Sequence, residues 1–217
     1  MRNNHLIPAF LFVALVSATV ASAQNDVYKN NLNLHVGPNI FMLAKSADFT
    51  PNDTVGFSSA NGFGTPTFQI AYDRAITKWF SIGAAYGYNS FGAKFNDLTY
   101  KDGEEVEEIG DVKLRIARNS FNIRPLFHYA NNGKLDLYSG FRLGFSLWTA
   151  RATTNLTDEQ LDEAADYLDK ARVAGVLPQF AITAFGLRAH FTENLGAGFE
   201  LNIGSPYLCS VGVDYRF

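Results

Sequence analysis

The sequence predicts an all-β chain that folds as an eight-stranded antiparallel up-and-down transmembrane β-barrel with a short helix in the third long loop. Three observations predict this class. Eight stretches alternate apolar and polar residues with period 2, as a strand with two different faces does. The connections between these stretches alternate between short and long. The two faces differ in bulk, because one carries large apolar side chains and the other carries glycine and charged residues.

The first 23 residues have the three parts of a secretory signal peptide. Arg2 supplies positive charge, Leu6 to Val16 form an apolar segment, and Ala21-Ser22-Ala23 is a small-residue cleavage site. The apolar segment is shorter than the roughly 20 residues that a spanning helix needs. We therefore expect residues 1–23 to be a removable signal peptide and residues 24–217 to form one barrel domain.

The composition argues against several classes of protein. The formal net charge is −3 and becomes −4 once Arg2 leaves, and a mildly acidic exported chain is a poor candidate for binding nucleic acid. Cys209 is the only cysteine, so neither a disulfide framework nor a cysteine-based metal site is expected. The 18 Gly, 10 Tyr and 19 Phe favour strands that close into a narrow barrel.

The eight expected strands share one pattern, in which every second side chain is apolar and faces outward. Pro38 falls within the first of them and indicates a bulge or a local bend there. A parity change near Ala117 to Ser120 indicates another bulge, and a second change separates Phe180 from Phe185. The expected strands are 32–42, 68–73, 80–89, 121–129, 135–147, 177–191, 195–203 and 207–217.

The connections support a barrel that crosses a membrane. The second, fourth and sixth, near Thr77, Asn132 and Glu193, are short, whereas the first, third and fifth are long. This alternation is typical of transmembrane barrels, which have short periplasmic turns and longer outer loops. The long connections are 45–64, 92–111 and 152–175.

Each long connection carries its own prediction. The first is polar and is expected to be a loop. In the second, Asp102-Gly103 predicts a tight hairpin, so the flanking strands should continue as a ribbon beyond the membrane. In the third, Thr157 and Gln160 fit a capping box, and the spacing of apolar residues predicts a helix from Asp158 to Arg172.

The charged residues decide which face lies inside. A soluble lipocalin-like barrel would turn its apolar face inward. Here that face carries Phe, Tyr, Leu and Ile, which are too bulky for an eight-stranded lumen, so the charges should lie inside. They should also pair, because an unpaired buried charge costs several kcal/mol. The expected interior network comprises Asp73, Arg124, Asp136, Arg142, Arg188, Glu200, Asp214 and Arg216, with His35, His128 and His190 also facing inward.

The last stretch carries a family resemblance. Tyr207, Cys209 and Val211 begin an apolar row that ends in Tyr215-Arg216-Phe217. This ending resembles the terminal strand of bacterial outer-membrane β-barrels, and the mature chain resembles small OmpA/OmpX-like barrels of the "porin family" type common in Bacteroidetes-like bacteria. The resemblance implies the outer membrane of a Gram-negative cell envelope as the location. It also implies that Tyr215 and Phe217 are the assembly signal read by the barrel-assembly machinery.

The resemblance implies a location rather than an activity. We expect a closed, monomeric structural or interaction barrel that contacts outer-membrane lipid and lipopolysaccharide, with no catalysis, cofactor or metal, and with loops that could bind an extracellular protein. The alternatives are a narrow pore for small solutes or ions, an accessory part of envelope secretion or adhesion, and a lipid-modifying enzyme. The enzyme is least favoured, because no His-x-Ser stands on an outward row. The acidic loops lack the Asp-x-Asp-x-Asp-Gly pattern of an EF-hand.

Overall fold

The computed structural model describes residues 29–38, 55–102, 105–131, 134–154, 174–204 and 206–217. The expected signal peptide and the expected helix from Asp158 to Arg172 lie outside these residues. No helix in the described part of the chain is long and apolar enough to cross a membrane. The strands are β1 (Asn30–Gly37), β2 (Val55–Gly56), β3 (Ser59–Gly64), β4 (Thr67–Ala75), β5 (Phe80–Asp102), β6 (Glu105–Asn131), β7 (Leu135–Thr154), β8 (Ala174–His190), β9 (Leu195–Gly204) and β10 (Cys209–Arg216).

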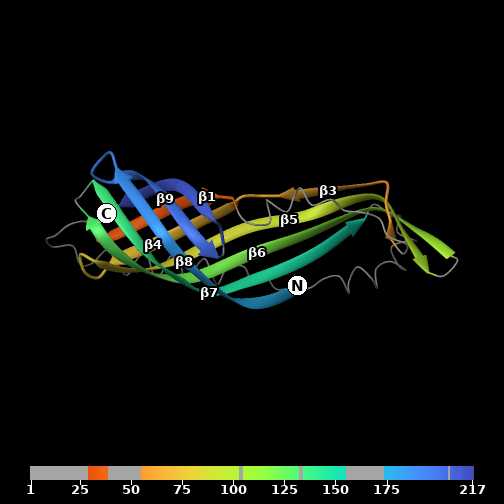
Figure 1. Cartoon of the computed structure of the whole chain (residues 1–217), viewed down its shortest axis with the longest axis horizontal. Helices are drawn as coiled ribbons and strands as arrows, with labels where there is room; N and C mark the ends of the chain where they lie inside the picture. The colour runs from red at the N-terminus through yellow and green to blue at the C-terminus, as the bar shows by residue number, and fades with distance from the viewer. Residues whose placement is uncertain (1–28, 39–54, 103–104, 132–133, 155–173, 205) are drawn as a thin grey trace, which may run out of the picture.

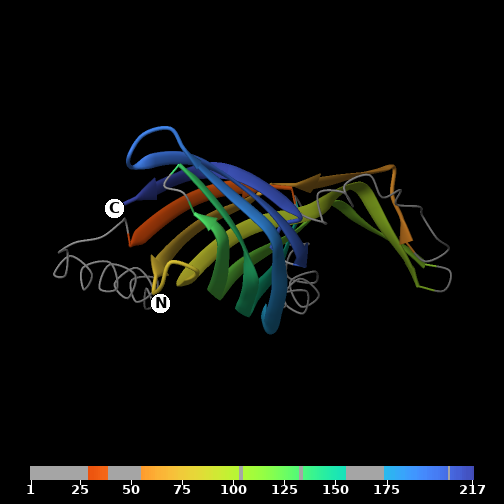
Figure 2. The ribbon, with the colours of Figure 1, turned by 60° about the vertical axis from the view of Figure 1, so that its left-hand side comes forward.

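Eight of these strands close into an antiparallel barrel (Figures 1 and 2). Neighbours in sequence pair from β4 to β10, and β1 closes the ring by pairing with both β4 and β10. In the closing pair, Leu32 lies opposite Tyr215 and Val36 opposite Val211. The expected fold class of the strands is confirmed, because every strand of the ring has two paired edges.

Tight turns join the strands at one end of the barrel. Between β4 and β5 the amide of Ile76 donates to the carbonyl of Phe80 at 2.9 Å. Between β8 and β9 the hydroxyl of Thr192 accepts from the amide of Leu195 at 2.8 Å. Both ends of the described chain lie at this end too, where the amide of Asn30 donates to the carbonyl of Phe217 at 3.1 Å. We call it the turn end.

At the other end β5 and β6 continue beyond the barrel as a long ribbon, which β7 accompanies as far as Thr154 opposite Val112 (Figure 1). Their pairing runs out to Asp102 opposite Glu105, which confirms the expected ribbon. Residues 55–64 differ from the expected loop, because β2 and β3 pair with the outer part of β5. The physical reason is that a ribbon edge presents unpaired backbone groups, and a neighbouring segment can satisfy them whatever its polarity.

The expected irregularity in the fourth barrel strand is wrong. Pairing between β5 and β6 is continuous from Phe80 opposite Phe127 to Phe95 opposite Val112, so residues 117–120 hold no bulge. Leu114 stands on the same face of its strand as the inward residues of the barrel. It lies on the ribbon, which encloses no lumen, and it is 40% exposed there. Pro38 does not interrupt a strand, since β1 ends at Gly37. The carbonyl of Pro38 accepts from the amide of Leu208.

The expected parity change in β8 is real. Thr183 faces inward and Phe185 pairs with Leu201 after a register shift that appears against β9. The opposite edge shows the same shift, between Tyr138 and Gly140 of β7. A bulge at this point lets Phe180 and Phe185 both turn outward although they stand five positions apart. The barrel wall therefore keeps one apolar outer face throughout.

Candidate functional site: the charged barrel interior

Polar and charged side chains fill the interior of the barrel. Each comes from the inward parity of its strand, and Arg124, Arg142, Glu200 and Asp214 are 0% exposed. Small residues on the same parity leave room for them, as at Gly198, where an added Cβ would stand 2.1 Å from an Asp214 oxygen. A closed barrel of eight strands is just wide enough for such a filling. The interior is thus a packed polar core.

Glu200 of β9 is the centre of one half of this core. Its Oε1 accepts from the Arg124 guanidinium at 2.6 Å and from the Tyr138 hydroxyl at 2.8 Å. Its Oε2 accepts from the Arg142 guanidinium and from the Tyr207 hydroxyl. A carboxylate between two arginines carries its charge in a dry interior because both oxygens are fully hydrogen-bonded.

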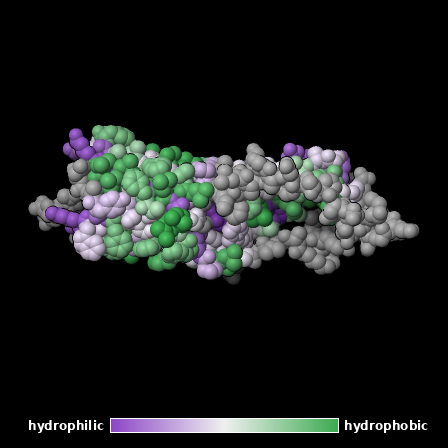
Figure 3. Space-filling model, viewed as in Figure 1, coloured by the Kyte–Doolittle hydropathy of each residue, from purple (hydrophilic) through white to green (hydrophobic). Residues whose placement is uncertain are grey.

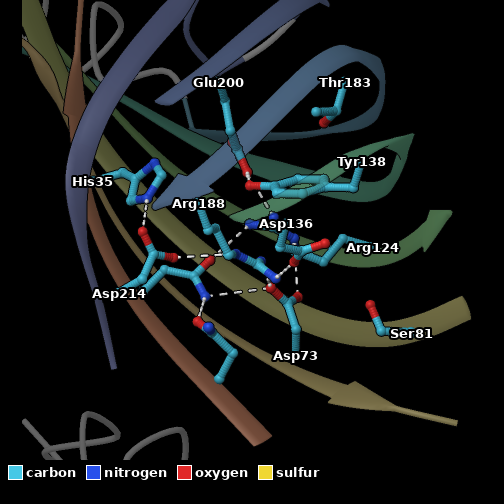
Figure 4. A network of polar contacts seen from close by, with 12 residues as sticks. His35, Asp73, Ser81, Arg124, Asp136, Tyr138, Thr183, Arg188, Glu200 and Asp214 are labelled. Carbon is cyan, nitrogen blue, oxygen red and sulfur yellow. Dashed lines mark hydrogen bonds and ion pairs between the residues drawn. The ribbon is translucent and has the colours of Figure 1, made fainter. Parts of the chain in front are cut away.

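Arg188 of β8 is the centre of the other half (Figure 4). Its guanidinium contacts three carboxylates, with Nη2 2.5 Å from Asp73, Nη1 3.3 Å from Asp136 and Nε 3.2 Å from Asp214. The same guanidinium stacks on the Tyr138 ring at 4.4 Å. Asp73 joins the two halves, since its second oxygen lies 3.0 Å from Nε of Arg124.

Two histidines extend the network. His35 of β1 lies between Ser210 and Asp214, with Nδ1 3.1 Å from the Ser210 hydroxyl and Nε2 3.4 Å from Asp214. His128 of β6 lies between Ser81 and Asp136, with Nε2 2.9 Å from the Ser81 hydroxyl and Nδ1 2.6 Å from Asp136. Because the imidazole can both donate and accept, each chain links a carboxylate to a hydroxyl.

The structure joins seven of the eight expected network residues through ion pairs, and it places Arg216 on the lining of a small cavity that Asp136 and Arg188 also line. Arg216 lies at the turn end, where its Nε donates to the carbonyl of Glu193 at 2.6 Å. As the last residue of β10, it stands at the rim of the interior. Parity indicates a face but not a depth along the barrel, so the sequence could not separate rim from core.

The prediction from sequence omitted one interior residue, Arg118, and placed another, Tyr207, on the outer face. Arg118 is buried at the end of the barrel opposite the turns, where it donates to Asn89 at 3.0 Å and to the carbonyl of Pro206 at 2.8 Å. Because a bulge was expected at 117–120, the alternation could not be used to assign Arg118 to the inward face. Tyr207, expected on the apolar outer row, is 1% exposed and faces Glu200. The row breaks because β10 begins only at Cys209, after the irregular residues 206–208, so Tyr207 does not share the alternation of the strand.

The expected assembly-signal residues lie on the outside. Tyr215 and Phe217 share the outward parity at the turn end, and their rings stack with centroids 5.8 Å apart. Tyr215 pairs with Leu32 across the seam that closes the barrel. Both side chains are therefore placed where a membrane or another protein can contact them.

A small cavity opens at the turn end of the interior. Its volume is about 60 Å³. We call it the mouth cavity, and its lining includes Lys29, Lys78, Ser81, His128, Asp136, Arg188 and His190. Within the described residues, no group of three or more His, Cys, Asp or Glu side chains is placed to hold a metal ion.

No protein-family model matches the chain, and no curated protein matches it. Solved structures do resemble it in fold. The N-terminal β-barrel domain of Pseudomonas aeruginosa OprF has a TM-score of 0.46 and 14% identity, over 88% of this chain and 100% of that one. The outer membrane protein OprG from Pseudomonas aeruginosa has a TM-score of 0.44 and 7% identity, over 89% and 97%. The attachment invasion locus protein Ail of Yersinia pestis has a TM-score of 0.41 and 10% identity, over 87% and 97%.

These values are too low to assign the chain to a family. Its architecture follows from its own strand pairing, which closes a ring of eight antiparallel strands around a charged interior.

Proposed function

We propose that the chain is an integral outer-membrane β-barrel protein whose ion-paired interior is closed to conduction and whose ribbon and long loops project outside the cell. The single observation that carries this proposal is the reversal of faces relative to a soluble barrel. The interior holds the charges, and the wall turns large apolar side chains outward.

Apolar side chains cover much of the barrel face that Figure 3 shows. Every barrel strand contributes at least one large hydrophobic side chain that is more than two-fifths exposed, among them Leu34, Phe68, Ile82, Ile123, Leu143, Phe180, Leu201 and Val213. Soluble monomers rarely expose apolar patches larger than a few hundred Å². Acyl chains would cover this surface, and a closed barrel satisfies its backbone hydrogen bonds without water.

Aromatic side chains gather at the turn end of the wall. The Trp79 ring stacks on Phe127 with centroids 6.3 Å apart, and Phe80 contacts Phe127 at 5.4 Å. Trp79 is 58% exposed. Aromatic residues are enriched where transmembrane barrels cross the membrane–water interface, so this cluster supports the turn end as one membrane boundary. We propose that this boundary faces the periplasm.

The interior supports a closed barrel. Arg124, Arg142 and Arg188 all bind carboxylates across the lumen, and Tyr138 and Tyr207 fill the space between them. An ion crossing the barrel would have to displace these pairs, which costs several kcal/mol for each charge left alone. We also propose that lipopolysaccharide contacts the wall, that the barrel-assembly machinery reads Tyr215 and Phe217, and that the protein is a monomer.

Cell fractionation combined with planar-bilayer recording tests the proposal. The full chain should sediment with outer membranes, require detergent for extraction, and change its gel mobility on boiling, as folded barrels do. After reconstitution it should pass no steady current. A protein that stays in the periplasmic fraction without detergent would end the membrane assignment, and a steady ohmic current would end the closed-barrel assignment.

A further inference from the structure

We infer that Ser81, His128 and Asp136 form a nucleophilic site for ester hydrolysis at the mouth cavity. This inference goes beyond the proposed closed barrel, and it departs from the sequence-based expectation of a protein without catalysis. Three neighbouring strands, β5, β6 and β7, each supply one of the three side chains. All three line the mouth cavity at the turn end.

The three side chains form a hydrogen-bonded chain from serine to histidine to aspartate, which is the arrangement that activates a serine. The Ser81 hydroxyl lies 2.9 Å from Nε2 of His128, and Nδ1 of that ring lies 2.6 Å from Asp136. The other oxygen of Asp136 lies 3.3 Å from the Arg188 guanidinium, which fixes the carboxylate. A nucleophile within hydrogen-bond reach of a base, and a base oriented by a third group, is the arrangement that serine hydrolases share on unrelated folds.

The second histidine of the interior supplies a comparison. His35 also lies between a serine and an aspartate, but its Nδ1 faces Ser210 and its Nε2 faces Asp214 at 3.4 Å. The side chains of His35 and Asp214 are 0% exposed, and none of these three residues lines the mouth cavity. The Ser210 chain is thus closed inside the protein, while the Ser81 chain meets the cavity.

The cavity defines the class of substrate. Its volume of about 60 Å³ holds roughly four water molecules, so a short acyl group fits. Ser81 is 2% exposed, which restricts attack to groups that enter the cavity. The cavity lining carries four cations, Lys29, Lys78, Arg188 and Arg216, against two carboxylates, Asp73 and Asp136, so it would attract a negatively charged ester. Arg188 is already bound to carboxylates, so the two lysines would stabilise an oxyanion. The structure assigns the site to short-chain esters with an anionic group.

The reaction needs only water as a second reactant. The Ser81 oxygen attacks the ester carbonyl carbon while its proton passes to Nε2 of His128. The tetrahedral intermediate then expels the alcohol, which takes that proton, and leaves an acyl group on Ser81. Water attacks the acyl carbon, again losing a proton to His128, and the acid leaves as the proton returns to Ser81.

Covalent labelling of the folded wild-type chain tests the site directly. The protein in detergent micelles is treated with a small fluorophosphonate, digested and mapped by mass spectrometry. We expect the adduct at Ser81 and none at Ser210. A folded protein, judged by its gel mobility without boiling, that carries no adduct at Ser81 would overturn the inference.

Kinetics with matched substrates adds a second readout. We expect hydrolysis of para-acetoxybenzoate, which is anionic, with a higher kcat/KM than that of its neutral methyl ester. Ser81→Ala and His128→Gln should each lower kcat/KM by on the order of 100-fold or more. Ser210→Ala is the control and should keep the wild-type rate. Equal rates of hydrolysis for wild type and a folded Ser81→Ala variant would contradict the proposal.

Discussion

Strands β5 and β6 run through both the barrel wall and the ribbon, but the alternation of their side chains has a different consequence in each region. Within the barrel, β5 and β6 turn one side chain to the lumen and the next outward, so Arg124 is 0% exposed and its neighbour Ile123 is 53% exposed. On the ribbon both faces lie outside the ring, and Leu114 is exposed on what was the lumen parity. Closure of the ring, and not the strand pattern, creates an inside. Substitutions in the two regions should therefore differ in cost.

The largest effect should come from Glu200→Ala. It leaves the guanidinium groups of Arg124 and Arg142 buried without their shared carboxylate. Breaking a buried ion pair on one side costs about 3–5 kcal/mol, so urea unfolding in micelles should shift by that amount. Glu193→Ala, at an exposed turn, is the control and should stay within about 0.5 kcal/mol. A loss below 1 kcal/mol for Glu200→Ala would mean that the interior is wet.

The next effect separates lipid from water on the outer face. Val213 is 50% exposed on the wall, and Leu114 is 40% exposed on the ribbon. Arginine on the lipid face of a barrel costs about 2–4 kcal/mol near the membrane midplane, whereas exposed substitutions in water cost little. Val213→Arg should therefore destabilise the barrel in lipid vesicles, and Leu114→Arg should not. Equal small costs would place the wall in water.

A smaller effect should follow from adding one methyl group to the lumen. In Gly198→Ala the new Cβ would stand 2.1 Å from an Asp214 oxygen and 2.6 Å from a His35 nitrogen. Overpacking of this kind costs about 1–3 kcal/mol, measured as a lower unfolding midpoint. Gly175→Ala meets no atom within 4 Å and is the matched control. If the two variants unfold alike, the interior is looser than the structure indicates.

The smallest effect belongs to the ribbon. Lys94 and Asp111 form an ion pair at 3.1 Å with side chains 48% and 32% exposed, and solvent-exposed pairs contribute little to stability. Lys94→Ala should leave barrel unfolding unchanged within error. Hydrogen bonds from Lys94 and from the Asp97 amide lower the pKa of Asp111.

The sign of the pH effect follows from that shift. The contribution of Asp111 is present above its ordinary pKa of about 4 and is lost as pH falls through the lowered value. Proteolysis of the ribbon should therefore speed up only in strong acid. Faster cleavage at neutral pH in wild type than in Lys94→Ala would contradict the role given to this pair.

The interior was predictable as a set of residues but not as a set of contacts. Period-2 alternation placed Asp73, Arg124 and Glu200 on one face. The pairing of arginines with carboxylates depends on strand register and on the stagger of the closed ring. The alternation within a single strand determines neither. The Ser81 chain shows this best. His128 and Asp136 were each expected to face inward, and only the pairing of β5, β6 and β7 brings them into line with Ser81.

The errors have a common cause. Tyr207, Leu114 and Arg216 each follow the alternation of their own stretch, and each stands where a strand begins, ends or leaves the ring. Local pattern reports the direction of a side chain relative to its neighbours. It cannot report whether a lumen, a rim or open water lies in that direction.

The sequence by itself determined the eight strands, their apolar and charged faces and the ribbon, because side-chain alternation and turn residues act over a few positions. The tertiary structure alone decided the ion-pair partners, the position of Tyr207 inside, and the meeting of serine, histidine and aspartate at the mouth. These depend on distances across the lumen, which are fixed only when β1 and β10 pair and the ring closes.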